Sequence, residues 1–500
     1  MSDLLLLRAD GGARLGFGHV MRSLALAEAW QRSGGHALFA MAESAPSLES
    51  RLCAHGIEIA RLDVEPGSSE DAKQTSALAL DRRAAWVAAD GYGFGAEWQS
   101  AVKDAGLRLL LWDDYGHAKS YSADLILNQN LHATAEIYAR REPYTRLLLG
   151  ARYAQLRGEF LVWRDWRREI PPVATRVLVT MGGADAENVT GEVVQALASL
   201  HNVEAVVVAG ASNPHINQLH ADVAAQSNLR LVVDAPDMPE RMAWADIAVS
   251  AGGSTCLELA FMGLPTVVVP FAANQELAAE ALGGSGLAIA IKPGTEGRKV
   301  RLASAIHALY SASEERRVTM SAGLRHLVDG RGAERVLRLL QAVKVSLRRV
   351  AQEDCTLLWQ WANDPATRSW SFCSDPIPWN DHVRWFQSKC GKTENLWYLA
   401  CDAASRPVGQ VRIDLESEHT GTINFSVAPE HRGNGLGTSL LCAALEQLFT
   451  ATAVNLVRAL VKAGNTASVR SFERAGFKQI PVELAPSDPA LQFIFSAGEF

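Results

Sequence analysis

Short apolar runs, separated by segments with helical periodicity, constrain the first 340 residues of this chain more than any other feature. Runs of this kind are typical of parallel strands buried on both faces, and their alternation with helices predicts a doubly wound sheet. Helices are expected, for example, at Met21–Arg32 and Glu97–Ala105. The expected strands of this first series are Leu4–Leu7, Ala37–Ala40, Ile57–Ala60, Trp86–Ala89, Leu109–Trp112 and Leu125–Leu127.

A second series of the same kind follows the polar, charged stretch Arg157–Ala174, which we interpret as a link between two halves. The two halves are expected to be Rossmann-like and to face each other over a cleft. Ligands of such sheets bind beyond the carboxyl ends of the strands. The expected strands of this second series are Arg176–Thr180, Val203–Ala209, Leu229–Val233, Ile247–Ser250 and Thr266–Val269.

The pattern changes after the helix expected at Val336–Ala342. Consecutive antiparallel strands are expected at Leu396–Cys401, Val408–Leu415 and Gly421–Val427. Because 500 residues exceed what one hydrophobic core holds, several domains are expected. We predict an α/β protein with two Rossmann-like domains, residues 1–165 and 166–343, followed by an α/β domain over residues 344–500.

The composition describes an ordinary globular protein, with a net charge of −7 and no long basic run, which argues against nucleic-acid or membrane partners. The seven cysteines are scattered and never in C-x-x-C spacing, so neither disulfides nor a zinc site is indicated. The apolar run at Leu4–Leu7 is too short for a signal peptide, and no stretch could cross a bilayer. These observations predict a cytoplasmic protein, whose oligomeric state they leave open.

A glycine-rich loop follows the last of the antiparallel strands and opens a helix expected to run through Leu448. A helix N-terminus presents free N–H groups and the positive end of its dipole to an anion. Glycines let the backbone approach phosphates without Cβ clashes. The loop consists of Arg432, Gly433, Asn434, Gly435, Leu436 and Gly437.

Two further segments accompany this loop, N-T-A-S-V-R-S-F-E-R-A-G-F from Asn465 and W-A-N-D-P-A-T-R from Trp361. From about Val350 onward the chain thereby resembles the GNAT superfamily of N-acetyltransferases. The resemblance implies acetyl-CoA as cosubstrate, with its pyrophosphate on the loop N–H groups. It also implies a pantetheine paired with the main chain near Ser426 and Val427, and Asn465 orienting the cofactor or the acceptor.

Phe472 departs from the pattern of many GNAT members, which have a tyrosine there to protonate the departing thiolate. Either water or another group supplies this proton, or the acetyltransferase half works slowly. The base that accepts the amine proton is equally open. Asp414 and Glu416 are candidates, since they end a strand near the expected acceptor cleft.

His19 distinguishes the loop after the first strand, where Gly16 and Gly18 suit a tight turn before a helix. The positive dipole end of a helix disfavours a protonated imidazole, and a neutral imidazole can act as a general base toward water. A histidine that merely caps or packs is the alternative explanation.

The second half contains S-A-G-G-S-T-C-L-E from Ser250, between a strand and a helix. It resembles the nucleotide-diphosphate site of GT-B enzymes such as the lipid II-forming N-acetylglucosaminyltransferase. The resemblance implies a pyrophosphate at the helix N-terminus and Glu258 on the ribose hydroxyls. Four residues would hold the pyrophosphate: Gly252, Gly253, Ser254 and Thr255. Four more are expected to face the same cleft: Gly182 and Gly183 in another turn, and Asn274 and Gln275 after a strand.

Further segments resemble one family more closely, the UDP-2,4-diacetamido-2,4,6-trideoxy-β-L-altropyranose hydrolases of pseudaminic acid biosynthesis. They are R-A-D with G-x-G-H-x-x-R, D-D-Y at 113–115, L-N-Q-N at 127–130, L-L-G-x-R-Y from Leu148, M-G-G-A-D from Met181 and N-Q-E at 274–276. The resemblance implies that His19 activates water against the anomeric carbon, with UDP leaving and no metal required. Asp10 and Arg14 are candidate sugar contacts, although Asp10 suits a helix-entry cap equally well.

Together the motifs predict a bifunctional enzyme that acetylates a UDP-linked 4-amino sugar and then releases UDP from the product. A fusion of consecutive steps raises the effective concentration of the intermediate at the second site. A UDP-sugar glycosyltransferase is one alternative, and a legionaminic-type or other nonulosonic acid precursor is another. The third is an acetyltransferase half that has lost catalysis, as Phe472 suggests.

Overall fold

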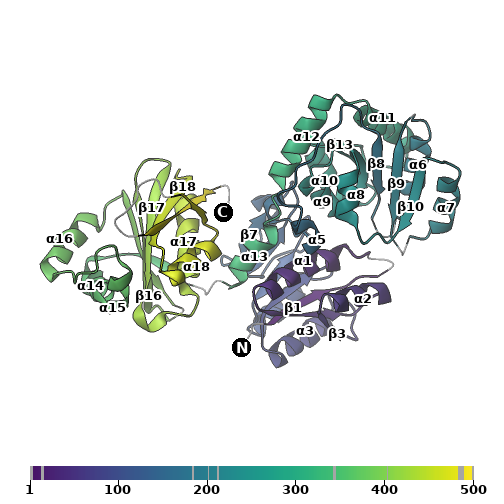
Figure 1. The fold of residues 1–500 in the computed structure, drawn as a ribbon. Coiled ribbons are helices and arrows are strands. Elements are labelled where there is room, and N and C mark those ends of the chain that lie inside the picture. The colour runs from purple at the N-terminus through teal and green to yellow at the C-terminus, as the bar shows by residue number, and fades with distance from the viewer. Residues whose placement is uncertain are drawn as a thin grey trace. The chain divides into compact units, whose positions relative to one another are not determined.

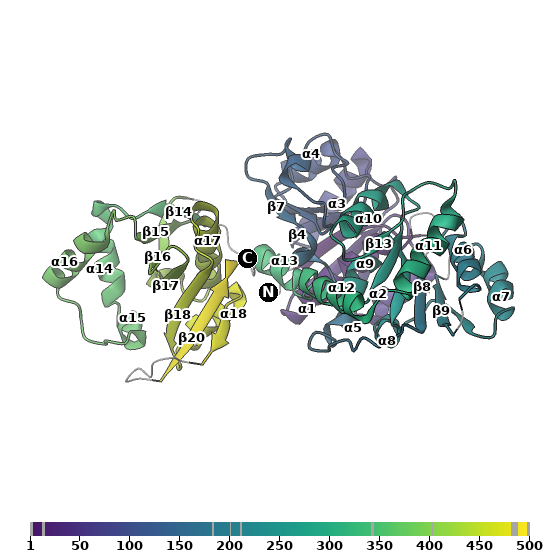
Figure 2. The same cartoon turned by 90° about the horizontal axis from the view of Figure 1, so that it is seen from above.

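The computed structural model describes residues 4–12, 16–182, 185–200, 202–210, 213–341, 345–402, 404–481 and 489–497. The chain separates into two compact units, Met1–Leu337 and Arg338–Phe500 (Figures 1 and 2). In the described residues, no helix has the length and apolar character that a membrane span requires. Each unit is described by itself below. The predicted borders near residues 165 and 343 stay predictions.

The first half of unit 1 holds a seven-stranded sheet of order β3-β2-β1-β4-β5-β6-β7, in which every pairing is parallel. Figure 1 shows helices on both of its faces. Its strands are β1 (Leu4–Ala9), β2 (His36–Met41), β3 (Glu58–Arg61), β4 (Ala84–Asp90), β5 (Leu109–Trp112), β6 (Leu125–Asn128) and β7 (Arg146–Leu149). Its helices are α1 (Gly18–Arg32), α2 (Pro46–Ala54), α3 (Ser69–Asp81), α4 (Ala96–Asp104) and α5 (Gly158–Leu161).

The second half of unit 1 holds a six-stranded parallel sheet of order β10-β9-β8-β11-β12-β13. Its strands are β8 (Arg176–Thr180), β9 (Glu204–Ala209), β10 (Leu229–Val233), β11 (Ile247–Ala251), β12 (Thr266–Val269) and β13 (Ile289–Ala290). Its helices are α6 (Val189–Leu197), α7 (Ile216–Ala224), α8 (Met238–Trp244), α9 (Thr255–Phe261), α10 (Ala273–Gly284), α11 (Arg298–Tyr310) and α12 (Glu314–Leu327). Helix α13 (Gly332–Gln341) contains the border between the two units.

Both sheets of unit 1 confirm the predicted doubly wound α/β class, and their cores are built by the apolar runs. In the first sheet, Leu6, Val87 and Leu111 pack with Trp98 of α4 in one buried cluster. The strand order reverses between β1 and β4 in the first sheet, and between β8 and β11 in the second. Loops that leave such neighbouring strands at their carboxyl ends diverge to opposite faces and leave room for a ligand. The loops after β1, β4, β8 and β11 therefore hold the positions of interest.

Unit 2 holds a mixed sheet of order β14-β15-β16-β17-β18-β20-β19, which is antiparallel except for the pair β17–β18. The antiparallel strands predicted from the sequence are confirmed. The strands are β14 (Ser346–Arg349), β15 (Asn395–Cys401), β16 (Pro407–Leu415), β17 (Thr420–Val427), β18 (Leu456–Lys462), β19 (Lys478–Ile480) and β20 (Ala490–Ser496). The helices are α14 (Cys355–Asn363), α15 (Pro365–Trp370), α16 (Trp379–Lys389), α17 (Leu436–Ala451) and α18 (Thr466–Ala475).

Strands β17 and β18 pair only at their beginnings. The parallel register joins Thr420–Thr422 of β17 to Leu456–Arg458 of β18 and then ends. Beyond it, Ile423–Val427 pairs only with β16 on its other side, and Leu460–Lys462 pairs only with β20. The sheet therefore opens between β17, its central strand, and β18.

Candidate active sites

His19 and Asp90 come together at the carboxyl ends of β1 and β4. His19 is the second residue of α1, and its Nδ1 atom lies 2.6 Å from Oδ1 of Asp90, the last residue of β4. Asp90 is buried, and 14% of the His19 side chain is exposed. The neighbouring positions of β1 and β4 in the sheet explain the contact, because they bring the loop before α1 to the end of β4.

Arg22, one turn after His19 on α1, favours the ionised form of Asp90. Its Nε and one terminal nitrogen lie 2.6 and 2.7 Å from the two carboxylate oxygens of Asp90. Burial acts to raise the pKa of Asp90, but the charges of Arg22 and His19 outweigh it and hold that pKa below its ordinary value. Asp90 is therefore an ionised acceptor. It favours the imidazole tautomer whose proton is on Nδ1, which leaves Nε2 as the basic nitrogen.

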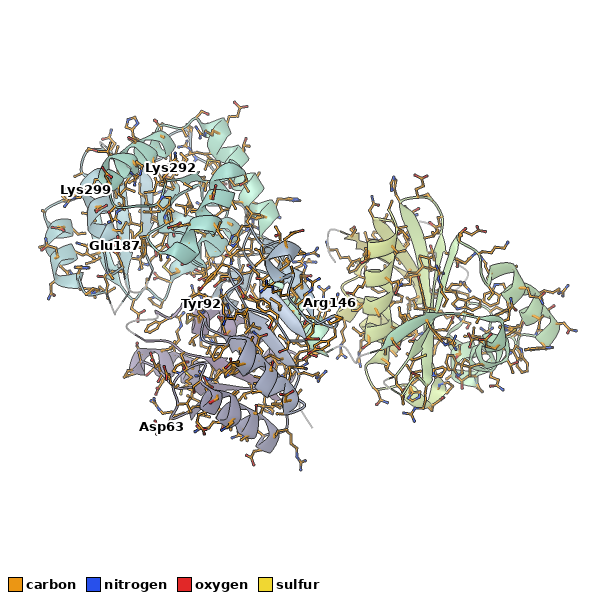
Figure 3. The ribbon with its side chains drawn as sticks, turned by 180° about the vertical axis from the view of Figure 1, so that it is seen from behind. Asp63, Tyr92, Arg146, Glu187, Lys292 and Lys299 are labelled. Atoms are coloured by element: carbon orange, nitrogen blue, oxygen red, sulfur yellow. The ribbon has the colours of Figure 1, made fainter. Side chains whose placement is uncertain are left out.

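The predicted motifs D-D-Y and L-N-Q-N surround this pair. Asp114 lies 2.8 Å from Arg22 and also accepts hydrogen bonds from the Tyr92 hydroxyl and the Asn130 amide, each at 2.9 Å. The Tyr92 ring packs edge-on against His19, at 4.9 Å between centroids. Figure 3 shows Tyr92 at the edge of the first half. Arg22 thus holds two carboxylates at once and fixes the position of the helix end that carries His19.

The other predicted residues of this loop have different surroundings. Asp10 accepts hydrogen bonds from the backbone N–H groups of Ala42 and Glu43, at 2.7 and 3.0 Å, and from Arg8 at 2.7 Å. Its two oxygens thereby hold the end of β2 beside β1, and its role as a sugar contact stays a prediction. Gly18 is the first residue of α1. Arg14 lies outside the described residues.

In the second half, Glu258 of α9 pairs with Arg157 from the predicted link. The Nε and one terminal nitrogen of Arg157 both lie 2.9 Å from Oε1 of Glu258. Burial raises the pKa of Glu258 above its ordinary value, and the charge of Arg157 opposes this rise. The adjacent N–H of Gly158 donates to Glu28 of α1 at 2.7 Å. The link therefore contacts both the helix that carries Glu258 and the helix that carries His19.

The predicted pyrophosphate residues lie where β11 turns into α9. Ser254 is the N-cap of α9 and Thr255 is its first residue. Gly252 must be a glycine for packing reasons, because a Cβ there would lie 2.9 Å from Cβ of Gln275 at the start of α10. A Cβ on Gly253 would meet nothing within 4 Å. Gln275 is thus next to the predicted phosphate turn.

The remaining predicted residues of this half are only partly placed. Gly182 follows β8 with φ +81°, a conformation that glycine adopts without strain. Gly183 lies outside the described residues. Asn274 belongs to α10, and its side chain is likewise outside the described part.

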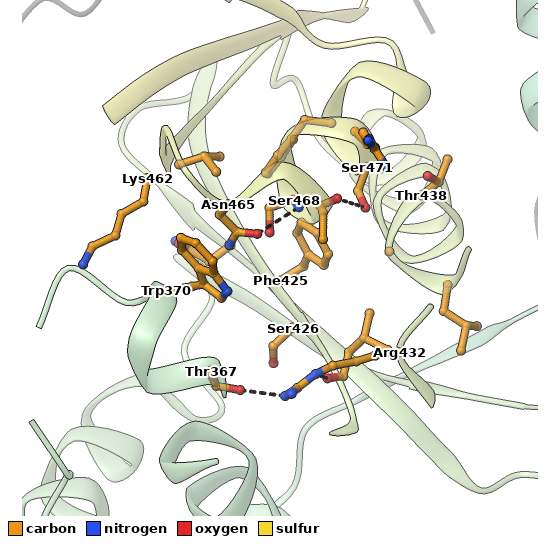
Figure 4. A pocket seen from close by; sticks show the side chains of 18 of the residues that line it. Thr367, Trp370, Phe425, Ser426, Arg432, Thr438, Lys462, Asn465, Ser468 and Ser471 are labelled. Carbon is orange, nitrogen blue, oxygen red and sulfur yellow. Dashed lines mark hydrogen bonds between the residues drawn. The ribbon is translucent and has the colours of Figure 1, made fainter. Parts of the chain in front are cut away.

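In unit 2, the opening between β17 and β18 is a cavity of about 580 Å³ (Figure 4). Most of the predicted coenzyme residues line it, whereas Asn434 is not among the lining residues. The predicted residues that line it are Val427, Arg432, Gly433, Gly435, Leu436, Gly437, Asn465 and Phe472.

The glycines of the loop are needed for two different reasons. Gly433 and Gly435 have φ values of +80° and +73°, and Gly435 is the N-cap of α17. Gly437 instead permits close packing of α17 against α18, since a Cβ there would lie 2.6 Å from Oγ of Ser471. The loop can therefore turn sharply and still present the first N–H groups of a 16-residue helix to the cavity.

Arg432 ties this loop to α15. One of its terminal nitrogens lies 2.7 Å from Asp364 and donates to the Thr367 hydroxyl at 2.8 Å (Figure 4). Asp364 is also the N-cap of α15, where it accepts the N–H of Thr367 at 2.9 Å. The aspartate of the N-D-P segment thus begins a helix and holds Arg432 of the glycine-rich loop in place.

Asn465 and Phe472 both belong to the α18 region. Asn465 is the N-cap of α18 and accepts the N–H of Ser468 at 3.1 Å. Phe472 is 3% exposed, stacks on Phe493 at 5.6 Å and meets Phe425 edge-on at 5.4 Å. Its ring is part of the hydrophobic core, and its outer surface borders the cavity. A hydroxyl-bearing residue is absent at this position, as the sequence indicates.

The two proposed bases lie elsewhere on the sheet. Neither Asp414 nor Glu416 is among the described residues that line the cavity. Asp414 is paired with Arg412 at 3.0 Å and with Lys389 at 3.3 Å. Its position, opposite Thr422 in the register, is where β17 and β18 are still paired.

The sequence does not single out Asp90, and it identifies Arg22 and Asp114 only as members of the motifs G-x-G-H-x-x-R and D-D-Y. A signal was available, because Asp90 directly follows the apolar run Trp86–Ala89 and precedes Gly91. Polar residues in this place lie at the carboxyl end of a parallel strand, where ligands of such folds bind. Across the described ranges, no group of three or more histidine, cysteine or acidic side chains has an arrangement suited to a metal ion.

Comparisons with known proteins find two family matches and several relatives. Residues 344–478 match the family Acetyltransferase (GNAT) domain, and residues 176–329 match the family Glycosyltransferase family 28 C-terminal domain. An uncharacterized protein of Methanocaldococcus jannaschii is 20% identical over 485 residues, which cover 94% of this chain and 96% of that protein.

Two further relatives match part of this chain. The UDP-2,4-diacetamido-2,4,6-trideoxy-beta-L-altropyranose hydrolase of Campylobacter jejuni is 24% identical over 290 residues, or 58% of this chain and 99% of that enzyme. The spore coat polysaccharide biosynthesis protein SpsG of Bacillus subtilis is 23% identical over 340 residues, or 67% of this chain and 96% of that protein. The predicted resemblance and fold class are confirmed. This chain is therefore a fusion of a GT-B-like region, homologous to the Campylobacter UDP-sugar hydrolase, with a C-terminal GNAT acetyltransferase domain.

Proposed function

We propose that the chain catalyses two consecutive steps on a UDP-linked amino sugar. The GNAT domain acetylates the 4-amino group of a UDP-4-amino-4,6-dideoxy-N-acetyl-altrosamine. Unit 1 then hydrolyses the resulting UDP-2,4-diacetamido-2,4,6-trideoxy-altropyranose to UDP and the free sugar. The name of the Campylobacter relative supports this substrate for unit 1, and the GNAT match supports acetyl transfer.

In the hydrolytic step, Nε2 of His19 takes a proton from water while the water oxygen bonds to the anomeric carbon. The bond between that carbon and the β-phosphate oxygen breaks, and UDP leaves with the electron pair. Asp90 stabilises the imidazolium that forms, because its carboxylate already holds Nδ1 at 2.6 Å. Arg22 keeps Asp90 ionised, so that the proton remains on the imidazole.

The leaving pyrophosphate is held in the second half of unit 1. The turn Gly252–Thr255 opens α9, and the N–H groups of this turn suit the phosphates. Glu258, one turn further along α9, accepts the ribose hydroxyls. Glu258 is hydrogen-bonded to Arg157, and it gives up part of this hydrogen bonding when it accepts the ribose hydroxyls.

The cavity of unit 2 fits a coenzyme A thioester. It lies in the opening of the sheet, beside a helix N-terminus with left-handed glycines. Its walls include β17 and β18 where these two strands no longer pair with each other. Acetyl-CoA supplies the activated acetyl group at this site. Arg432–Gly437 holds the pyrophosphate, and the main chain at Ser426 and Val427 pairs with the pantetheine. Because Phe472 carries no hydroxyl, water supplies the proton that the departing thiolate takes up.

The contact between His19 and Asp90 is the observation that carries the hydrolase proposal. The test is incubation of the full chain with acetyl-CoA and UDP-4-amino-4,6-dideoxy-N-acetyl-β-L-altrosamine, followed by mass spectrometry and NMR. We expect one acetyl group to be added and UDP to be released, in that order, without another acceptor. Acetylation without UDP release would contradict the hydrolase role of unit 1, and UDP release without acetylation would contradict the proposed acetyl acceptor.

A glycosyltransferase is the second candidate for unit 1, and the match to the family Glycosyltransferase family 28 C-terminal domain favours it. The same histidine could activate an alcohol. UDP release that requires an added alcohol would establish this alternative. A legionaminic-type or other nonulosonic acid precursor, tried in the same assay, would show whether the sugar configuration differs.

A further inference from the structure

The cavity of unit 2 has a second end, away from the loop Arg432–Gly437. Aromatic side chains and Lys462 line it there. Trp370, the last residue of α15, and Phe372 both line the cavity, and each is 46% exposed. In Figure 4, Trp370, Lys462 and Asn465 lie on one side, and Arg432 lies across from them. Large exposed aromatic side chains in a cavity mark a place where a ligand provides the missing contacts.

Helix α15 spans the opening of the sheet. At its beginning, Asp364 is paired with Arg432 of the phosphate loop, on the β17 side. At its end, the Trp370 indole lies against Gly464, just after β18, where a Cβ would be 3.2 Å from the ring. Helix α15 thus contacts both the β17 side and the β18 side of the opening, and Trp370 is held at its end although nearly half of the Trp370 surface is exposed.

The charges along the cavity have one sign. Among the described lining residues there is no aspartate or glutamate, whereas the cationic side chains are Arg432, Lys462, Arg470 and Arg474, beside His431. Arg432 belongs to the loop assigned to the coenzyme pyrophosphate, and Arg470 and Arg474 lie on the exposed face of α18. Lys462 ends β18 on the aromatic side. A polyamine acceptor needs carboxylates at such a place, and this cavity offers a cation instead.

We propose that Trp370, Phe372 and Lys462 form the acceptor subsite of the acetyltransferase, which selects a nucleotide-linked amino sugar over a free one. The indole and phenyl faces pack against the apolar face of the pyranose ring. The ammonium group of Lys462 pairs with the diphosphate that links the sugar to its nucleoside. This inference rests on the proposed acetylation of a UDP-linked sugar, and it names the residues that recognise that acceptor.

The test compares Lys462→Gln and Trp370→Leu with the parent enzyme, using UDP-4-amino-4,6-dideoxy-N-acetyl-β-L-altrosamine and the same amino sugar without UDP. Lys392→Gln, an exposed lysine outside the cavity, is the matched control. We expect Lys462→Gln to raise the KM for the UDP-sugar about tenfold or more, since a hydrogen bond to a charged group is lost. The KM for acetyl-CoA and the kcat/KM for the free sugar stay unchanged. Trp370→Leu lowers the kcat/KM for both sugars by about the same factor.

The outcomes distinguish a failure of the acceptor subsite from a failure of the proposed acetylation. If the parent enzyme acetylates the UDP-sugar but Lys462→Gln changes only the KM for acetyl-CoA, Lys462 binds the coenzyme and the subsite is wrong. If neither Lys462→Gln nor Trp370→Leu changes the kinetics, the proposed subsite is also wrong. If the parent enzyme acetylates a polyamine and no UDP-sugar, the proposed function itself fails, and the inference fails with it.

Discussion

The Nδ1 atom of His19 lies 2.6 Å from a carboxylate oxygen of Asp90, and Arg22 holds the same carboxylate from its other side. The histidine is on the first turn of α1 and the aspartate ends β4, so the contact joins a helix start to a strand end at the point where the strand order reverses. This arrangement gives the histidine one tautomer and a fixed orientation, which a general base toward water requires.

Replacement of His19 by alanine should abolish UDP release and spare acetyl transfer. The variant lacks the proton acceptor, and a general base typically accounts for about 10²- to 10⁴-fold in rate. UDP release from the diacetylated sugar nucleotide and acetyl-CoA consumption are measured side by side. Hydrolysis at the parent rate would contradict the assignment of the base.

Asp90→Asn should lower kcat for UDP release by about 10²- to 10⁴-fold and leave the KM for the sugar nucleotide nearly unchanged. The amide can donate to Nδ1 and so favours the wrong tautomer, in which Nε2 carries the proton. Asp90→Glu, which keeps the charge, should recover part of the activity. A merely structural role predicts that both variants lose hydrolysis in proportion to their loss of folded protein, which circular dichroism would show.

The ionised state of Asp90 should also appear in the acid stability of the protein. Its folded pKa lies below the ordinary value of 3.8, so this carboxylate stabilises the fold above that pH and ceases to do so as the pH falls through the folded pKa. We expect the urea midpoint of the parent protein to fall more steeply than that of Asp90→Asn as the pH is lowered below about 4. Parallel profiles would mean that Asp90 titrates alike in the folded and unfolded chain.

Gly435→Val should raise the KM for acetyl-CoA about tenfold or more and leave UDP release unchanged. The backbone at this N-cap has φ +73°, which costs a branched residue about 1–2 kcal/mol, and the loop must shift away from the phosphates. Gly391→Val is a matched control, since Gly391 has φ +78° and lies outside the cavity. A simultaneous loss of both activities would indicate misfolding or coupling between the two units.

Phe472→Tyr should raise kcat for acetyl transfer several-fold, because it supplies a phenol where many GNAT members have one. The ring borders the cavity. The measurement is steady-state acetyl transfer, with the KM for acetyl-CoA as the control for cofactor binding. An unchanged kcat would mean that proton delivery to the thiolate does not limit the reaction.

The local features of both sites could be predicted from the sequence, whereas their long-range pairings could not. Apolar runs identify the strands, and glycines beside a helix start identify the loop at Arg432. The pairing of His19 with Asp90 crosses 71 positions, and that of Arg432 with Asp364 crosses a similar distance. Such contacts depend on strand order, which the periodicity of a single chain does not encode.

Asp414 is a second residue whose surroundings in the fold cannot be predicted from the sequence. A carboxylate at a strand end suggests a base, and the sequence alone places it near the acceptor. In the folded domain, Arg412 and Lys389 neutralise it at the closed end of the β17–β18 opening. Which end of a strand meets a cavity depends on where two neighbouring strands separate.

The separation of β17 from β18 also has a thermodynamic consequence. A sheet that opens in its middle has two internal edges, whose N–H and C=O groups would otherwise pair with each other. A ligand that fills the opening supplies these partners and acts as a substitute strand. A ligand that binds only the folded domain stabilises it, so the free energy of unfolding rises with the logarithm of ligand concentration. Under the proposed function acetyl-CoA is this ligand, and we expect the free energy of unfolding of the domain to rise with acetyl-CoA concentration.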